Sequence, residues 1–296
     1  MSQIPARWFS AIGFLVLIFA STLPLTTHAQ SKLLDAETLA PDLDLVPLDA
    51  AIPPSAPSVW RFLRWTGLDA LAYTRTVGST LPLMVVGGAT LVSTTSLLDE
   101  PIGAELKGEP GGVVGAFLDA GNRLGERRAI VPAAALFGAT LFTDNTRLQD
   151  AAFTSFQSAL YACAVGYSLK AVIGRARPYT GDGAFGYEPF SPSRDYYSFP
   201  SGHTTMAFAL VTPWVVYYPG PVTYGLLGLS TGTAIARVAH DEHWATDVLA
   251  GAAIGAVTGV FLARRHLSET EAREAVRVQP LVSAEHVGAS VTIPIR

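Results

Sequence analysis

The sequence predicts an all-α fold, a membrane-associated helical bundle of about six core helices. Composition is the first reason, because 49% of the 296 residues are hydrophobic and only 15% are charged, against roughly a quarter charged in an ordinary soluble domain. The second reason is that long apolar runs alternate with short polar segments. The third is that small residues recur inside the runs, as in GGAT and GAAIGAVTG, which allows helices to approach one another closely.

We interpret each apolar run as one core helix. The runs cover residues 76–98, 129–143, 151–169, 204–218, 221–236 and 248–263. Between them lie segments such as DEPIGAELKGEPGG, TDNTRLQD, YYPGP and HDEHW, which hold prolines, glycines or charges and break helices. The polar side chains are therefore expected in a few loops that join the helices.

The chain begins with the pattern of an export signal. Arg7 precedes the apolar stretch WFSAIGFLVLIFA, and TTHAQ offers a small-residue cleavage site after Ala29. An uncleaved membrane anchor is the alternative, and both interpretations predict export. The predicted order is a signal peptide at 1–29, a proline-rich linker and interfacial segment at 30–75, a helical domain at 76–265 and a tail at 266–296.

The segments on either side of the helical domain carry weaker patterns. In the interfacial segment the large apolar side chains expected at an interface are Trp60, Phe62, Leu63 and Trp65. The tail opens with the charged, helix-like SETEAREAVR and ends in the alternating VTIPIR, which is typical of a short strand.

Charge and cysteine content exclude two classes of protein. A net charge of −4 provides no basic surface for nucleic acid. Cys163 is the single cysteine, so an intrachain disulfide is impossible, and its apolar neighbours predict a small buried side chain.

Membrane topology stays open between two hypotheses. A span needs about 20 apolar residues, whereas the run at 129–143 has 15 and contains Pro132. The positive-inside rule makes both RLGERR at 123–128 and ARRH at 263–266 cytoplasmic, but six spans after a cleaved signal would put ARRH outside. Either one run does not span, or the bundle is periplasmic and only associates with the membrane.

A polar stretch, ARVAHDEHWATD, interrupts the apolar pattern at 236–247. His243 and Asp247 are four residues apart, so at a helix start they share a face. A carboxylate that binds one imidazole nitrogen leaves the other as a lone-pair donor, which makes a nucleophile or a base. Arg237 adds a planar cation that matches phosphate oxygens. These residue types favour phosphoryl chemistry over acyl transfer.

Two more clusters agree with that chemistry. SFPSGHTT places Ser201, Gly202 and His203 at a predicted helix start, where backbone N–H groups bind anions and a histidine can act as an acid. LKAVIGRARP places Lys170 and Arg177 near the end of another helix, as further cations around an oxyanion. Each cluster alone has a structural explanation, but all three at ends of apolar helices favour one shared site.

A zinc site is the metal alternative for this segment. His240 and His243 could face one ion, with Asp247 as a third ligand. The sequence is not H-E-x-x-H, however, and the neighbouring basic clusters oppose a dication. We therefore expect no metal.

The three clusters together resemble the type 2 phosphatidic acid phosphatase superfamily, which shares its site with vanadium haloperoxidases and bacterial class A acid phosphatases. The family signature is K-x6-R-P, P-S-G-H and S-R-x5-H-x3-D. Here it reads Lys170-AVIGRA-Arg177-Pro178, then Pro200-Ser201-Gly202-His203, then Ala236-Arg237-VAHDE-His243-WAT-Asp247. Ala236 departs from the usual serine and removes one hydroxyl donor. The resemblance covers about residues 76–265.

The resemblance implies roles for these residues and a fold like that of the phosphatidic acid phosphatases and haloperoxidases. His243 would attack phosphorus, oriented by Asp247, and His203 would protonate the leaving oxygen. The phosphate-binding set would be Lys170, Arg177, Ser201, Gly202 and Arg237. Arg175 and His240 lie nearby but outside the signature. No metal or other cofactor is implied; vanadate would be needed only by a haloperoxidase.

The expected function is metal-independent hydrolysis of phosphate monoesters or pyrophosphates, with lipid phosphates favoured because an apolar bundle could admit a lipid tail. A vanadium haloperoxidase, a soluble periplasmic acid phosphatase and a non-catalytic protein with a relic site are the alternatives. The expected partners are a phosphorylated substrate and membrane lipid, not nucleic acid; the oligomeric state is open. We expect an exported protein with its site on the periplasmic side, membrane-associated or periplasmic.

Overall fold

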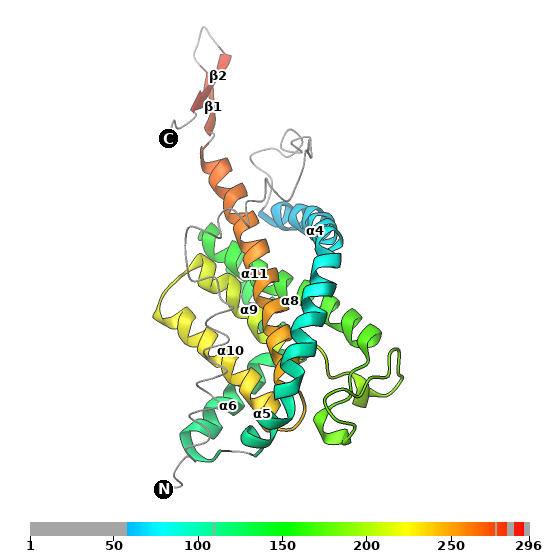
Figure 1. Cartoon of the computed structure of the whole chain (residues 1–296). Helices are drawn as coiled ribbons and strands as arrows, with labels where there is room; N and C mark the ends of the chain where they lie inside the picture. The colour runs from blue at the N-terminus through cyan, green and yellow to red at the C-terminus, as the bar shows by residue number, and fades with distance from the viewer. Residues whose placement is uncertain (1–57, 109, 276, 283–286, 293–296) are drawn as a thin grey trace.

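The computed structural model describes residues 58–108, 110–275, 277–282 and 287–292. The predicted signal peptide at 1–29 and the linker up to residue 57 lie outside the described residues. Within these ranges the chain forms a bundle of helices, α4 to α11, with a two-stranded hairpin beyond the end of α11 (Figure 1). The predicted all-α bundle is confirmed.

Each of the six predicted apolar runs lies within or largely within a helix. The helices are α4 (Ser58–Thr95), α7 (Ile130–Thr140), α8 (Thr146–Ile173), α9 (Gly202–Tyr217), α10 (Pro221–Ala239) and α11 (Ala245–Ala275). Local signals fix the ends of α8: the Asn145 side chain accepts a hydrogen bond from the Leu148 N–H, and Gly174 follows the helix with φ of 58°. Glycine adopts this left-handed conformation without strain, and it commonly ends helices.

Two further helices, α5 (Asp99–Leu106) and α6 (Gly112–Gly125), form where the sequence predicted none. α5 lies inside the segment interpreted as a helix breaker, and its Pro101 falls in the first turn, where proline is tolerated. α6 is rich in glycine, which disfavours helix in isolation. At Gly121, however, a Cβ would lie 2.7 Å from the Leu229 carbonyl oxygen of α10. Close helix packing therefore outweighs the low helix propensity.

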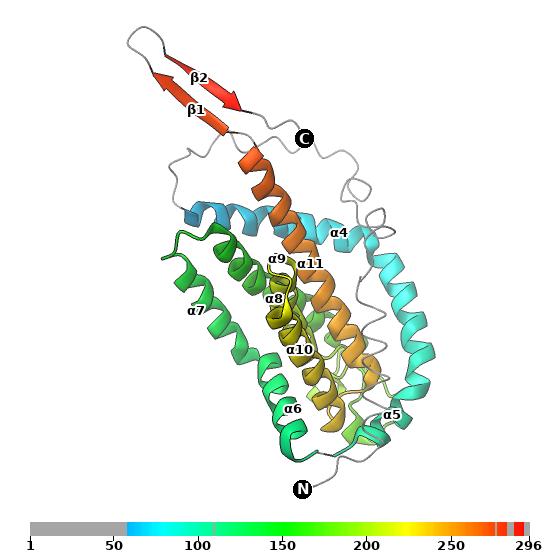
Figure 2. The same ribbon diagram turned by 90° about the vertical axis from the view of Figure 1, so that its left-hand side faces the viewer.

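The interfacial segment at 58–75 is the first half of α4, which crosses one end of the bundle and then turns down its side (Figure 2). Phe62 and Trp65 are buried at 3% and 0% exposure, whereas Trp60 and Leu63 are exposed. Two of the four large side chains thus belong to the core. The helix continues through residue 75, and the domain boundary there stays a prediction.

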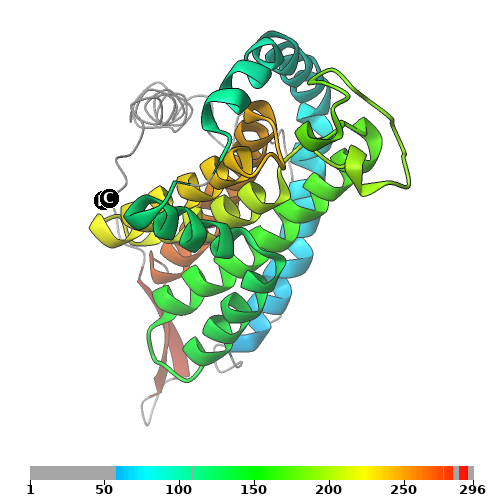
Figure 3. The same ribbon diagram turned by 90° about the horizontal axis from the view of Figure 1, so that it is seen from below.

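Helices α9 and α11 pack at the centre of the bundle through a stripe of glycines. Seen from below, the orange ribbon of α11 lies beside the yellow-green ribbon of α9 (Figure 3). A Cβ at Gly251 would lie 2.5 Å from the Ser201 carbonyl oxygen, and one at Gly255 would lie 2.5 Å from that of Thr205. The small residues of GAAIGAVTG therefore do what the sequence predicts, and they bring the N-terminal ends of both helices together.

A buried polar network joins α4, α8 and α11 at the end of the bundle away from the predicted site residues. His266 Nε2 lies 2.7 Å from Asp69 Oδ2, and its Nδ1 lies 2.7 Å from Thr154 Oγ1. The Trp65 ring stacks on the imidazole with centroids 3.9 Å apart. The side chains of Asp69 and His266 are fully buried, so each needs the other to satisfy its polar atoms.

The tail first extends helix α11 and then forms a hairpin. SETEAREAVR carries α11 on to Ala275, and strands β1 (Arg277–Val282) and β2 (Val287–Thr292) follow as an antiparallel hairpin. Strand β2 covers only the first two residues of VTIPIR, so the predicted strand begins earlier than expected.

One helix of the described chain is long and apolar enough to cross a membrane, judged by length and composition. The stretch is Ala245–Thr270 of α11, and 56% of its most apolar window is buried inside the bundle. A core helix of a soluble protein has the same properties, so membrane topology stays a prediction.

Replacing Asp69 with alanine should destabilise the fold by about 3–5 kcal/mol, because it leaves His266 and Arg265 without their buried partner. Denaturant unfolding of the purified protein measures this change. Ser268→Ala, at an exposed position of the same helix, is the control and should change stability by less than about 0.5 kcal/mol. Equal stability of the two variants would contradict the role assigned to the network.

Candidate functional site

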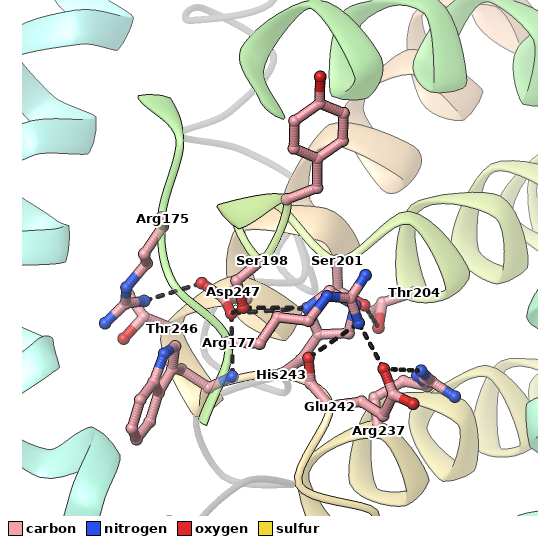
Figure 4. Close-up of polar contacts among 12 residues, drawn as sticks. Arg175, Arg177, Ser198, Ser201, Thr204, Arg237, Glu242, His243, Thr246 and Asp247 are labelled. Carbon is pink, nitrogen blue, oxygen red and sulfur yellow. Dashed lines mark hydrogen bonds and ion pairs between the residues drawn. The ribbon is translucent and has the colours of Figure 1, made fainter. Parts of the chain in front are cut away.

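The predicted site residues meet at one end of the bundle, at or next to the ends of four helices. Figure 4 shows five of them, namely Arg177, Ser201, Arg237, His243 and Asp247. Lys170 lies in the last turn of α8, and Ser201 immediately precedes α9. Arg237 lies in the last turn of α10, and Asp247 lies in the first turn of α11. Helix ends carry unpaired backbone groups and partial charges, so the fold gathers polar chemistry at the edge of an apolar bundle.

His243 lies in the turn before α11, which begins at Ala245, and not on the helix as the spacing predicted. Its Nδ1 still lies 3.5 Å from Asp247 Oδ2, and the two side chains are 2% and 0% exposed. Because Nδ1 faces the carboxylate, Nε2 is the nitrogen that remains for chemistry. The predicted pairing is present, with a turn in place of a helix face.

Both oxygens of the Asp247 carboxylate accept hydrogen bonds. Its Oδ1 accepts a hydrogen bond from Arg175 Nη1 at 2.8 Å. Its Oδ2 accepts bonds from the Trp244 N–H at 2.9 Å and from the Ser198 hydroxyl. Burial acts to raise the pKa of Asp247, but the bonds and charges of His243 and Arg175 lower it to about 2. The carboxylate is therefore ionised at every physiological pH.

Arg175 lies outside the signature, yet it pairs with two buried carboxylates of the site. It is fully buried between two carboxylates, with Nη2 at 2.7 Å from Asp99 Oδ2 and Nη1 on Asp247. Asp99 in turn accepts a hydrogen bond from the Thr246 N–H at 2.8 Å. The arginine within GRARP was visible in the sequence, but its partner Asp99 lies 76 residues away without any motif.

Arg177 and Arg237 share one carboxylate, that of Glu242. Arg177 Nη1 contacts Glu242 Oε2 directly, and Arg237 Nη2 lies 3.2 Å from the same oxygen (Figure 4). Arg237 Nη1 also donates to Asn122 Oδ1 at 3.3 Å. Both arginines thus point at one anionic oxygen, next to His243. Sequence analysis missed Glu242, although it directly precedes the histidine.

Lys170 is buried and faces the start of α9. Its Nζ donates to the carbonyl oxygens of Tyr197 at 2.6 Å and Ser198 at 3.2 Å. A Cβ at Gly202 would lie 3.6 Å from Lys170 Cε, so the lysine reaches the first turn of α9. Burial lowers the pKa of Lys170 to about 7; the nearby Asp247 acts to raise it, while the neighbouring arginines lower it further.

Ser201 and His203 lie at the N-terminus of α9. The Ser201 N–H donates to the Asp247 carbonyl oxygen at 2.9 Å, and its hydroxyl accepts from Thr204 Oγ1 at 3.0 Å. Burial and the charges of Arg237 and Arg177 lower the pKa of His203 to about 3. Burial likewise lowers the pKa of His243, against its hydrogen bond with Asp247. Without an anion in the site, both histidines are therefore neutral near pH 7.

Ala236, the one departure from the signature, is fully buried in an apolar cluster that includes Leu106, Phe208 and Val238. It lies one residue before Arg237 on α10. The methyl group therefore packs in the core, and the lost hydroxyl leaves no gap in the apolar cluster.

A cavity of about 290 Å³ opens beside these residues. Its lining consists of Arg127, Tyr167, Lys170, Arg177, Arg194 and Tyr197. Two of the lining residues belong to the predicted phosphate-binding set. The others carry no sequence motif, so a search for motifs could not identify them.

The remaining sequence expectations concern metals and thiols. Within the described ranges, no three His, Cys, Asp or Glu side chains are grouped to hold a metal ion, His240, His243 and Asp247 included. Cys163 is half-buried, and burial raises its thiol pKa to about 11, so the thiol is unreactive at neutral pH.

Replacing Arg175 with alanine should destabilise the protein by about 3–5 kcal/mol, because two buried carboxylates then face each other without a cation. Denaturant unfolding tests this expectation. Arg123→Ala, which removes an exposed arginine of α6, is the matched control and should be near neutral. A stability loss below about 1 kcal/mol for Arg175→Ala would contradict the bridging role.

Three comparisons place these observations among known proteins. Residues 152–270 match the model of the PAP2 superfamily. A lipid A 1-phosphatase of Rhizobium johnstonii is 34% identical over 102 residues, which cover 32% of this chain and 41% of that protein. One of Rhizobium etli is 31% identical over 102 residues, 34% of this chain and 44% of that protein. One of Porphyromonas gingivalis is 42% identical over 65 residues, 21% and 15% of the two chains.

Among solved structures, the crystal structure of Aquifex aeolicus LpxE matches with a TM-score of 0.43 and 20% identity, over 56% of this chain and 95% of that one. The chain spans less than half the length of each curated relative. The family match extends over all three signature motifs. Segment 152–270 of this chain is therefore similar to the PAP2 superfamily.

Proposed function

We propose that this protein is a metal-independent phosphatase that hydrolyses phosphorylated lipids through a phosphohistidine intermediate. The observation that carries the proposal is that His243 Nδ1 faces the buried Asp247 carboxylate, while the charges of Lys170 and Arg177 act on the imidazole. Arg237 lies with Arg177 on the carboxylate of the adjacent Glu242. An imidazole oriented in this way is a nucleophile, and a cluster of cations stabilises the charge on a transferring phosphoryl group.

In the first step Lys170, Arg177 and Arg237 hold the phosphoryl oxygens, together with the Ser201 hydroxyl and the Gly202 amide. His243 Nε2 attacks phosphorus, and the bond to the leaving oxygen breaks. His203 donates a proton to that oxygen. The anionic substrate offsets the arginine charges that lower the pKa of His203 to about 3, so this histidine is protonated more readily with substrate bound than without it.

In the second step water replaces the leaving group. The now neutral His203 accepts a proton from the water as its oxygen attacks phosphorus. The P–N bond breaks, inorganic phosphate forms and His243 is restored. Asp247 stays ionised throughout and stabilises the positive charge on the His243 ring. All the charges that this cycle needs come from side chains of the protein.

A phosphorylated lipid is the substrate class that the comparisons support. The relatives named above are lipid A 1-phosphatases, enzymes whose name specifies a phosphate on a lipid. Exposed apolar side chains such as Tyr167, Val172 and Phe190 occur on the elements that carry the site, where a lipid tail could contact them. Phosphatidate, phosphatidylglycerol phosphate and undecaprenyl pyrophosphate are suitable candidates.

We further propose that the protein is exported and acts at the membrane, with the site on the periplasmic side. The export signal pattern at 1–29 and the apolar stretch of α11 support this localisation.

Purified protein should release phosphate from phosphatidate, undecaprenyl pyrophosphate or p-nitrophenyl phosphate in the presence of EDTA, and vanadate should inhibit the release. His243→Ala should reduce the rate by about 1000-fold or more, because the nucleophile is lost. His240→Asn, at a histidine outside the signature, should keep activity within about threefold. Full activity of His243→Ala would refute the mechanism. No release from any substrate would instead favour bromide oxidation with vanadate.

Anion binding should weaken as the pH rises through about 7, because Lys170 loses its charge at its lowered pKa. Competitive inhibition by sulfate tests this, since sulfate remains a dianion throughout the range from pH 5 to 9. The inhibition constant should rise by up to about tenfold per pH unit above 7. In Lys170→Arg it should stay nearly flat, because a guanidinium remains protonated. The same slope in both proteins would assign the effect to another group.

A further inference from the structure

The cavity beside the site is larger and more cationic than one phosphoryl group requires. Lys170 and Arg177 line one part of it, and Arg127, Arg194, Tyr167 and Tyr197 line the rest. Its volume of about 290 Å³ approaches that of sites for whole small molecules, roughly 300–1000 Å³. The signature thus accounts for one part of the cavity lining, and the function of the two additional arginines is open.

Among the residues that the structure describes, the additional arginines differ from the other arginines of the site in having no carboxylate partner. Arg175 pairs with Asp99 and Asp247, while Arg177 and Arg237 pair with Glu242. Within the described part of the chain, no carboxylate lies at ion-pair distance from Arg127 or Arg194. Unpaired cations grouped around a cavity attract anions.

The Arg127 side chain has a defined position. It follows the end of α6, where a Cβ at Gly125 would lie 2.5 Å from the His203 carbonyl oxygen. This close contact holds Arg127 beside the first turn of α9. The guanidinium lies 5.0 Å from the centroid of the Tyr167 ring, a cation–π contact that orients it. The charge of Arg127 also acts on Lys170 and His203, lowering the pKa of each.

Arg194 is tied to the site through its backbone. Its carbonyl oxygen accepts a hydrogen bond from Arg177 Nε at 3.3 Å, and Arg194 is one of the residues that line the cavity. The neighbouring Asp195 is engaged elsewhere, with the hydroxyls of Tyr179 and Ser193. The 3-10 helix Arg194–Tyr196 therefore contacts Arg177 through its backbone and contributes a second arginine to the cavity lining.

We propose that Arg127 and Arg194 form a second anion subsite, which binds a phosphate adjacent to the one that His243 attacks. The proposal rests on the proposed function and deepens it: diphosphate monoesters are the preferred substrates over monophosphates. His243 Nε2 attacks the terminal phosphorus and the P–O–P bond breaks. The remaining phosphate monoester leaves, takes a proton from His203 and is held by the two arginines until it departs.

Binding of small anions to the full-length protein tests the subsite without turnover. Isothermal titration calorimetry compares inorganic phosphate with methylenebisphosphonate, which carries two phosphonates and resists hydrolysis. Wild-type protein should bind the bisphosphonate at least tenfold more tightly. In Arg127→Gln/Arg194→Gln this preference should fall below about threefold, because bidentate cationic contacts to the second group are lost.

A charge-matched variant separates the subsite from general electrostatics. Arg123→Gln/Arg128→Gln removes two exposed arginines from the same region, neither of which lines the cavity. It should keep the tenfold preference, and circular dichroism should show both variants folded. An equal loss of preference in the two double variants would overturn the subsite.

Turnover separates failure of the subsite from failure of the proposed function. The ratio of kcat/KM for a prenyl diphosphate to that for the monophosphate of the same prenol should fall about tenfold in Arg127→Gln/Arg194→Gln. An unchanged ratio in an active enzyme, or equal binding of both anions by wild-type protein, overturns the subsite alone. If wild-type protein binds neither anion and releases no phosphate, the proposed function is overturned as well.

Discussion

The site depends on one buried interaction, the bridge that Arg175 makes between Asp99 and Asp247. Burying two carboxylates is costly unless each is paired and hydrogen-bonded, and here one guanidinium pairs with both. The bridge ties α5, the segment after α8 and the first turn of α11 into one unit. Since Asp247 faces His243, the geometry of the proposed nucleophile depends on an arginine outside the signature.

Helix packing supplies the second constraint. The glycine stripe of α11 lets the α9 backbone approach so closely that a Cβ at Gly251 would meet the Ser201 carbonyl oxygen. At the same end the Ser201 N–H bonds to the Asp247 carbonyl. The first turn of α9, proposed to bind an anion, and the histidine–aspartate pair are therefore positioned relative to each other by backbone contacts, which vary less than contacts between long side chains. The apolar packing of α9 against α11 thus also fixes the positions of the polar groups at their N-terminal ends.

Features of the structure that depend on neighbouring residues could be predicted from the sequence, whereas features that depend on contacts between distant residues could not. Apolar runs and H-x3-D spacing are local patterns, so the six helices and the pairing of His243 with Asp247 could be predicted. Helix α6 could not, because its glycines disfavour helix until α10 packs on them. Asp99 could not be predicted either, since its role arises only from a contact across 76 residues. Glu242 was overlooked for a different reason: one acid in a charged turn has an ordinary explanation as a solvated side chain.

The contact of Glu242 with both Arg177 and Arg237 also bears on how fast the site can empty. Four or more cations around a small anion would hold inorganic phosphate tightly, and slow release would then limit the cycle. In the proposed cycle, the Glu242 carboxylate would replace the departing product on Arg177 and Arg237, so that these two cations keep an anionic partner. Phosphate entry and exit would then be an exchange of one anion for another, with a smaller change in desolvated charge at each step. The residue next to the nucleophile would in this way favour repeated turnover at the expense of affinity.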